Sequence, residues 1–273
     1  MTAPFITIAR GDAPLIVSLP HTGTEIPEPL ASRLVSPWRA RKDTDWWIDR
    51  LYAFAGDLGA TVVRTGLSRT AVDVNRDPSG ASLYPGQPTT ELCPTMTFDG
   101  EPLYRSGEML DPAEVAERRA RFFDPYHEAL SAEIERLRAR HGRIVLYDGH
   151  SIRSVIPRLF EGELPHFNIG TNSGASCAPA LQELAAEACA ATPFSAVVNG
   201  RFKGGWITRR YGRPERGVHA VQMELACRGY MDEPPDPTPG NWPTPYDPER
   251  AAPMRDALSR LLAAVLLWAQ QGS

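Results

Sequence analysis

The sequence predicts an α/β fold in which a largely parallel or mixed β-sheet is flanked by helices. Short segments rich in β-branched and apolar residues alternate along the chain with longer segments that have helical patterns. Strands separated by helices of this length are typical of α/β folds. The 273 residues can bury a large core, either as one α/β domain or as two small ones.

Six segments are predicted to be strands from their β-branched and apolar content. They cover residues 15–19, 60–65, 70–74, 143–148, 195–199 and 219–225. The strand at 143–148 is the expected centre of the sheet, and it runs directly into Gly149 and His150. Because glycine tolerates conformations that other residues avoid, we expect the chain to turn tightly at Gly149.

Four segments between and after the strands are predicted to be helical, at residues 44–59, 111–142, 178–192 and 248–270. The second opens with Asp111 and Pro112, a capping residue followed by proline at the first helical position. Pro125 lies inside this segment, and we expect it to break or kink the helix.

Two proline- or glycine-rich loops are long, at residues 77–110 and 228–248. Loops of this length are uncommon unless they cover a site or are disordered.

The composition excludes several classes of protein. A net charge of −4 provides no basic surplus for nucleic acid. The longest apolar run, at residues 261–269, is about half of what a bilayer requires. The N-terminus shows no signal peptide, so a cytoplasmic protein without membrane contact is expected. The four cysteines are scattered without metal-site spacing, and we expect them to be reduced and mostly buried.

Two histidines follow predicted strands directly. His21 comes after the strand at 15–19, and His150 comes after the strand at 143–148. Reacting groups in α/β sheets gather beyond the carboxyl ends of the strands. If these two strands are neighbours, both imidazoles could bind one metal ion, since a catalytic zinc usually takes three protein ligands. The candidates for the third ligand are Glu25, Asp43, Asp45 and Asp148.

Six blocks of the sequence together point to a family. They are "SLPHTGTEIP", "KDTDWW", "SRTAVDVNRDPSG", "DGHSIRSVIPRLFEG", "NGRFKGGWITRRYG" and "GVHAVQMEL". In content and order they resemble the N-formylglutamate amidohydrolases, the deformylases that finish one bacterial route of histidine breakdown. The resemblance runs over about residues 4–270, and it implies a single catalytic domain over residues 1–273.

The resemblance implies a metal-dependent hydrolase, most readily with zinc, whose fold is similar to that of the zinc carboxypeptidases and the phosphorylase/hydrolase-like group. The family's histidines fall on His21 and His150, and its acidic residue falls on Asp45. Carboxypeptidase-like enzymes use His-x-x-Glu, whereas here Glu25 lies four residues after His21. We therefore prefer Asp45 to Glu25 as the third metal ligand.

Hydrolysis of an amide at such a site also needs a group that moves a proton from the attacking water to the leaving amine. Glu224 fits this role, because it is a carboxylate in an otherwise apolar strand. Desolvation should raise its pKa towards the range that suits a proton shuttle.

N-formylglutamate is a dianion, and arginine pairs best with carboxylates. Asn75 and Arg76 resemble the Asn-Arg pair that carboxypeptidase and aspartoacylase relatives use on the substrate carboxylate. Arg153 is the expected catalytic cation and carboxylate partner near His150. Further cations in the suspected blocks are Arg69, Lys203 and Arg209. The segment "RFKGGWITRRYG" is expected to be a flexible flap that closes over the substrate.

The function that these features favour is hydrolysis of N-formyl-L-glutamate to formate and L-glutamate. One alternative is another N-acyl amino acid amidohydrolase, or a carboxypeptidase-like enzyme, with an acidic small-molecule substrate at the same site. A second is a binder of acidic amino acids without metal or activity.

Overall fold

The computed structural model describes residues 4–271 and contains one seven-stranded mixed sheet. The strands are β1 (Ile6–Ala9), β2 (Leu15–Leu19), β3 (Thr61–Thr65), β4 (Ile144–Ile152), β5 (Phe167–Gly170), β6 (Ala196–Val198) and β7 (Val218–Ala226). Their order is β1-β3-β2-β4-β7-β5-β6. The four central strands β3, β2, β4 and β7 are parallel, while β1 and β5 run antiparallel to them. The predicted α/β class with a mixed sheet is confirmed.

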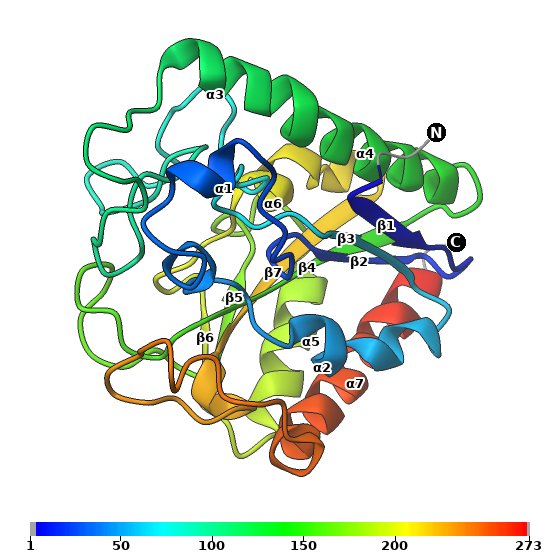
Figure 1. Cartoon of the computed structure of the whole chain (residues 1–273). Coiled ribbons are helices and arrows are strands. Elements are labelled where there is room, and N and C mark those ends of the chain that lie inside the picture. Colours follow the sequence, from blue (N-terminus) through cyan, green and yellow to red (C-terminus); the bar gives the residue numbers. More distant parts are fainter. Residues whose placement is uncertain (1–3, 272–273) are drawn as a thin grey trace.

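Helices cover both faces of this sheet (Figure 1). The α-helices are α1 (Leu30–Arg33), α2 (Ile48–Leu51), α3 (Pro112–Arg118), α4 (Asp124–Arg138), α5 (Pro179–Ala190), α6 (Trp206–Tyr211) and α7 (Pro248–Gln270). Short 3-10 turns are η1 (Arg39–Arg41), η2 (Ala53–Gly56), η4 (Pro214–Arg216) and η5 (Cys227–Gly229). Residues of α2, α5 and α7 share one apolar cluster, whereas α4 and α6 belong to another on the opposite face.

The central strands are buried on both faces, as parallel strands between helical layers must be. In β2, Leu15 and Val17 contribute to the cluster beneath α5 and α7, while Ile16 contributes to the cluster beneath α4. In β4, Val145 and Tyr147 alternate with their neighbours in the same way. This period of two explains why these strands appear as continuous apolar runs in the sequence.

Several predicted elements differ from the structure. Residues 70–74 form a buried loop and not a strand, and residues 44–59 hold only the short turns α2 and η2. Strands β1 and β5, each four residues long, were not predicted. Short apolar segments carry too few residues for their period to be recognised.

The long helical segment is confirmed, with Asp111 accepting a hydrogen bond from the Glu114 backbone N–H at its start. Pro125 does not break it. The π-helical turn η3 (Arg119–Phe123) precedes the proline and joins α3 to α4. A wider turn changes the hydrogen-bonding pattern just before the residue that lacks an N–H, so the helix continues.

The turn predicted at Gly149 is wrong, because β4 continues as a strand to Ile152. A Cβ atom at Gly149 would lie 3.0 Å from Cδ2 of Leu19 and 3.4 Å from the Tyr52 ring. The position therefore needs glycine for close packing against its neighbours.

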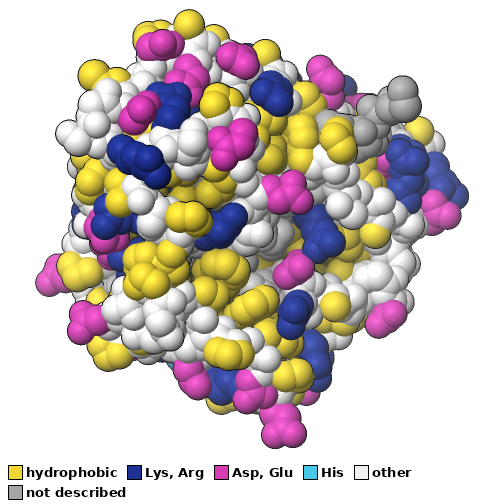
Figure 2. Space-filling view, in the orientation of Figure 1, with side chains coloured by type: hydrophobic (Ala, Val, Ile, Leu, Met, Phe, Trp, Pro, Cys, Tyr) yellow, Lys and Arg dark blue, Asp and Glu magenta, His cyan; other side chains and the backbone are white. Residues whose placement is uncertain are grey.

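All four cysteines are buried and unpaired, as predicted. Within residues 4–271 we find no helix long and apolar enough to span a membrane. Acidic and basic side chains are interspersed over the face shown in Figure 2.

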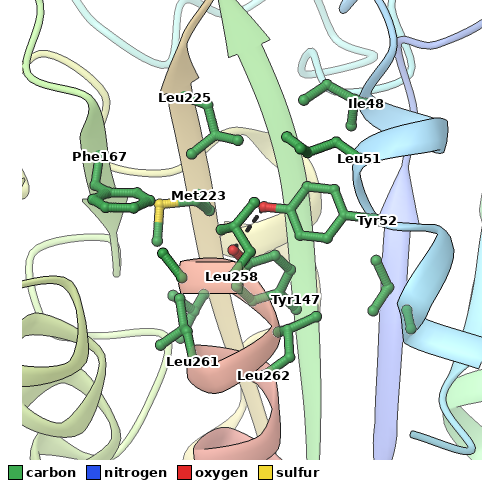
Figure 3. Close-up of a cluster of buried hydrophobic side chains, with 14 of the residues drawn as sticks. Ile48, Leu51, Tyr52, Tyr147, Phe167, Met223, Leu225, Leu258, Leu261 and Leu262 are labelled. Carbon is green, nitrogen blue, oxygen red and sulfur yellow. Dashed lines mark hydrogen bonds between the residues drawn. The ribbon is translucent and has the colours of Figure 1, made fainter. Parts of the chain in front are cut away.

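The core contains one buried polar pair that makes its stability testable. The hydroxyl oxygens of Tyr52 and Tyr147 lie 2.8 Å apart (Figure 3). Among the described residues, neither hydroxyl has another hydrogen-bond partner. Replacing either tyrosine with phenylalanine should lower the free energy of unfolding by about 1–3 kcal/mol, since the remaining hydroxyl is buried unpaired.

The double variant should cost less than the sum of the two single variants, because it leaves no orphan hydroxyl. Urea denaturation of the four proteins measures this. Strictly additive costs would contradict the pairing.

Candidate active site

One face of the sheet changes from apolar to polar towards the carboxyl ends of its strands. On this face of β4, Ile144 and Leu146 pack under α4, and Asp148 and His150 follow at the same spacing. The register pairs Asp148 with Gln222 and His150 with Glu224 on β7. Since residues two apart share a face, four polar side chains form one cluster on two neighbouring strands. The polar side chains expected at the strand ends therefore lie together.

Three side chains in this region converge on one point. His21 Nδ1 and His150 Nδ1 lie 3.1 Å apart, and Asp45 Oδ2 lies 3.1 Å from His150 Nδ1 and 3.7 Å from His21 Nδ1. All three residues are buried, with exposures of 1–3%. The three residues together form a group that could hold a metal ion.

Asp45 reaches this point from a loop fixed by backbone contacts. Its N–H donates to the carbonyl of His21 at 3.0 Å, and its carboxylate accepts from the Ser151 N–H at 3.2 Å. Two residues later, Trp47 takes a left-handed conformation with φ 63°, which starts α2. The predicted helix at 44–59 is thus replaced here by a turn that brings the carboxylate to the histidines.

The other three acids considered as ligands lie elsewhere. Asp43 accepts from the Phe98 N–H at 2.7 Å, and the Glu25 carboxylate lies beside Gly66. Asp148 contacts the opposite nitrogen of His150. Of the four candidates, Asp45 alone faces both Nδ1 atoms.

The outer nitrogens of both imidazoles contact carboxylates. His21 Nε2 lies 2.7 Å from Asp73 Oδ1, and His150 Nε2 lies 2.9 Å from Asp148 Oδ2. An ionised carboxylate only accepts hydrogen bonds, so each Nε2 carries the proton and each Nδ1 is left as an acceptor. Carboxylates in this second layer fix the tautomer of metal-binding histidines in the same way.

Three acceptor atoms therefore face one another, which is unfavourable unless positive charge lies between them. The field of the site favours such charge. Burial opposes protonation of His150, but Asp148 and Asp45 outweigh it and hold its pKa well above the usual value. Burial also opposes ionisation of Asp45, yet the hydrogen bonds that His150 and His21 donate to it when they are protonated keep its pKa below the usual value. Two imidazoles and one carboxylate are a donor set that suits zinc.

Arg69 and Asn75 complete the surroundings of the ligand set. Arg69 donates to Asp73 at 2.7 Å and to Asp45 at 3.4 Å, and its guanidinium lies 4.8 Å from the Phe98 ring centroid. The Asn75 amide donates to Asp148 at 3.1 Å, while its oxygen accepts from the Ile207 N–H. The Asn75 amide group is therefore used mainly to hold Asp148 and the backbone at Ile207 in place.

Glu224 lies beside the ligand set on β7. Its Oε2 accepts from Gln222 Nε2 at 3.1 Å. Burial raises its pKa to about 7, although the nearby His150 acts in the opposite direction. A carboxyl group with this pKa can both accept and release a proton near neutral pH.

A pocket of about 580 Å³, including its open mouth, leads to these groups. It is lined by His21, Arg69, Asn75, Arg76, Tyr84, Pro88, Thr89, Thr90, Phe98, His150, Ile152, Leu159, Arg201, Phe202, Gly205, Gln222 and Glu224. Of the predicted substrate-binding residues, the structure brings Asn75 and Arg76 to the pocket.

The structure does not bring Arg153, Lys203 or Arg209 to the pocket lining. Arg153 pairs with Asp99 at 2.6 Å and with Asp43 at 3.5 Å. Lys203 is exposed, and Arg209 donates to the Gly204 carbonyl. Arg153 follows the end of β4, so its nearness to His150 in sequence does not place it on the same face.

The segment at residues 201–212 is packed, in contrast to the predicted flap. Gly205 is buried, and its N–H donates to Gln222 Oε1 at 2.6 Å. A Cβ atom at Gly205 would lie 2.5 Å from the Asn75 amide group. The glycine pair therefore permits close packing behind the site.

Sequence reasoning missed Asp73, Gln222 and Arg201 as site residues. Asp73 lay in a segment predicted to be a strand, and its position two residues before Asn75 was the available signal. Gln222 could have been found from its period-two spacing with Glu224. Arg201 had no signal beyond its place in a suspected active-site block.

Comparisons with known proteins identify relatives of this chain. A family model described as N-formylglutamate amidohydrolase matches residues 13–231. Two curated relatives, each named N-formylglutamate deformylase, are 45% identical. The one from Pseudomonas aeruginosa aligns over 267 residues, 97% of each chain, and the one from Pseudomonas putida over 268 residues, 96% of each chain.

Among solved structures, an N-formylglutamate amidohydrolase from Ralstonia eutropha JMP134 is 26% identical with a TM-score of 0.80. The match covers 98% of this chain and 99% of that one. An Agrobacterium tumefaciens protein with 17% identity and a TM-score of 0.70 shares the fold, over 96% of this chain and 94% of that one. With a family match over most of its length and relatives of this identity, the chain belongs to the N-formylglutamate amidohydrolase family.

Proposed function

We propose that this protein is a metal-dependent deformylase that hydrolyses N-formyl-L-glutamate to formate and L-glutamate, as in the last step of histidine degradation. The observation that carries the proposal is the convergence of His21, Asp45 and His150, beside a pocket that His21, His150 and Glu224 line. The names of the 45% identical relatives support the substrate. A likeness of the fold to zinc carboxypeptidases stays a prediction.

His21 Nδ1, His150 Nδ1 and Asp45 Oδ2 would hold the ion, most readily zinc. A divalent ion there supplies Lewis acidity, which polarises a carbonyl group and lowers the pKa of water. Asp73 and Asp148 hold the two imidazoles in the tautomer that this requires.

Glu224 moves the proton in this proposal. Gln222 occupies Oε2 of the carboxylate, which leaves Oε1 to take a proton from the attacking water. The same oxygen then delivers the proton to the glutamate nitrogen as the C–N bond breaks. A pKa of about 7 suits both steps.

Arg69 replaces Arg153 in our assignment of the cation that stabilises charge on the formyl oxygen. Both arginines pair with two acids, but Arg69 lines the pocket and Arg153 does not. Arg76 also lines the pocket, and its guanidinium donates to Thr90. We assign Arg76 to a substrate carboxylate, and we assign Asn75 to positioning His150 through Asp148.

The first test concerns the metal. Purified protein should contain about one divalent ion per chain and should release formate from N-formyl-L-glutamate. Treatment with a chelator should abolish the release, and added zinc should restore it. N-acetyl-L-aspartate and short peptides should react much more slowly. Full activity without metal would contradict the mechanism, and faster cleavage of peptides would favour a carboxypeptidase-like enzyme.

The second test concerns Glu224. The Glu224→Gln variant should keep its metal content while kcat drops by roughly 10²-fold or more, because the amide cannot shuttle a proton. Glu215→Gln, which changes an exposed acid just before β7, is the matched control and should keep the full rate. An unchanged kcat in Glu224→Gln would rule out Glu224 as the proton carrier.

The third test concerns Asp73, the carboxylate that contacts the outer nitrogen of His21. The Asp73→Asn variant should bind the metal about 10- to 100-fold more weakly, because the amide can donate to His21 Nε2 and so favour the wrong tautomer. Competition with a zinc indicator measures the dissociation constant. If zinc affinity is unchanged, Asp73 does not orient His21.

A further inference from the structure

The pocket contains a cation that the proposed mechanism does not use. Arg201 follows β6 and lines the pocket at half-buried exposure. Its Nε donates to the Leu159 carbonyl at 2.8 Å, and its Nη2 donates to the Pro88 carbonyl at 2.9 Å. Two backbone groups from separate loops thus hold the guanidinium in place.

Arg201 forms no ion pair within the part of the chain that the structure describes. Within residues 4–271, no Asp or Glu lies within 4.0 Å of its guanidinium, and Nη1 has no hydrogen-bond partner. The guanidinium lies 5.2 Å from the Phe202 ring centroid and 5.5 Å from that of Tyr84. Burial lowers the pKa of Arg201, with Arg76 acting in the same direction and Tyr84 and Glu224 in the opposite one. A fixed, partly desolvated cation of this kind favours an anionic ligand.

Arg76 and Arg201 lie at different places relative to the ligand set. Arg76 Nε is 3.7 Å from the Asp73 carboxylate, which in turn contacts His21. Arg201 is instead held by loop carbonyls at residues 88 and 159. Arg76 is therefore linked to the proposed metal ligands through Asp73, whereas the hydrogen bonds of Arg201 go to other parts of the pocket wall.

The substrate's two carboxylates are also at different distances from the scissile bond. The α-carboxylate is attached to the carbon that bears the reacting nitrogen, and the side-chain carboxylate is separated from that carbon by two methylene groups. We propose that Arg201 is the specificity-determining residue that binds the side-chain carboxylate, while Arg76 binds the α-carboxylate. This inference rests on the proposed function.

The free atoms of Arg201 fit this role. With Nε and one N–H of Nη2 used by carbonyls, both N–H groups of Nη1 and the second of Nη2 can face a carboxylate end-on, as a bidentate pair. The Arg209 guanidinium lies 5.0 Å from the Tyr84 ring centroid, its Nε donates to the Gly204 carbonyl, and it does not line the pocket. Arg201 is thus the better candidate of the two.

The test compares N-formyl-L-glutamate with N-formyl-L-glutamine, whose side chain has the same shape without the charge. In Arg201→Gln, kcat/KM for N-formyl-L-glutamate should fall on the order of 10²-fold, while kcat/KM for N-formyl-L-glutamine should change only a few-fold. Arg76→Gln should lower both values by similar factors. Arg210→Gln, an exposed arginine of α6, is the matched control and should preserve both.

The inference is overturned if Arg201→Gln keeps the wild-type preference for glutamate over glutamine, or if Arg76→Gln removes that preference instead. Calorimetry with L-glutamate and L-glutamine on the metal-loaded protein separates this result from failure of the proposed function. If the wild type releases no formate, the proposed deformylase function is rejected. If L-glutamate nevertheless binds and this binding depends on Arg201, the assignment of Arg201 as a carboxylate-binding residue still holds. Unchanged metal content and melting temperature in each variant exclude unfolding as the cause.

Discussion

The structure depends on keeping a group of charged side chains buried at one end of a parallel sheet. A buried ion is costly unless another charge or a hydrogen bond compensates it. Here each acid has a partner: Asp73 contacts His21 and Arg69, and Asp148 contacts His150. Removing one member would leave another uncompensated, so the network restrains loops that have no regular structure. The loop carrying Asp73 is held in this way.

The parallel arrangement explains why two strands suffice to form the centre of the site. Strands β4 and β7 run in the same direction and in register, so His150 and Glu224 are lateral neighbours on one face. Nearer the amino ends of these two strands, the same face is apolar and packs under α4. One strand pair therefore provides both part of the core and two of the candidate site residues, while the loops bring His21 and Asp45 to its edge.

The sequence predicted the parts of the site that follow local rules and missed those that depend on tertiary contacts. His21 and His150 were found because each follows an apolar strand, and Glu224 because it interrupts one. The segment at 70–74 has the alternation of a strand, yet it is a loop whose Asp73 bonds to His21. Arg153 was misplaced because its partner, Asp99, lies 54 residues away in the chain. Ion pairs between residues so far apart in the chain cannot be recognised from the spacing of residues in the sequence.

The three pocket arginines differ in how far acids already neutralise them, and this ranks their possible roles. Arg69 contacts two carboxylates, at 2.7 and 3.4 Å, so it can polarise a substrate oxygen but has little capacity left for a carboxylate. Arg76 has one acid at 3.7 Å. Arg201 has only backbone carbonyls. Unneutralised positive charge is therefore least on Arg69 and greatest on Arg201. An anionic group that enters the pocket would be attracted most strongly to Arg201.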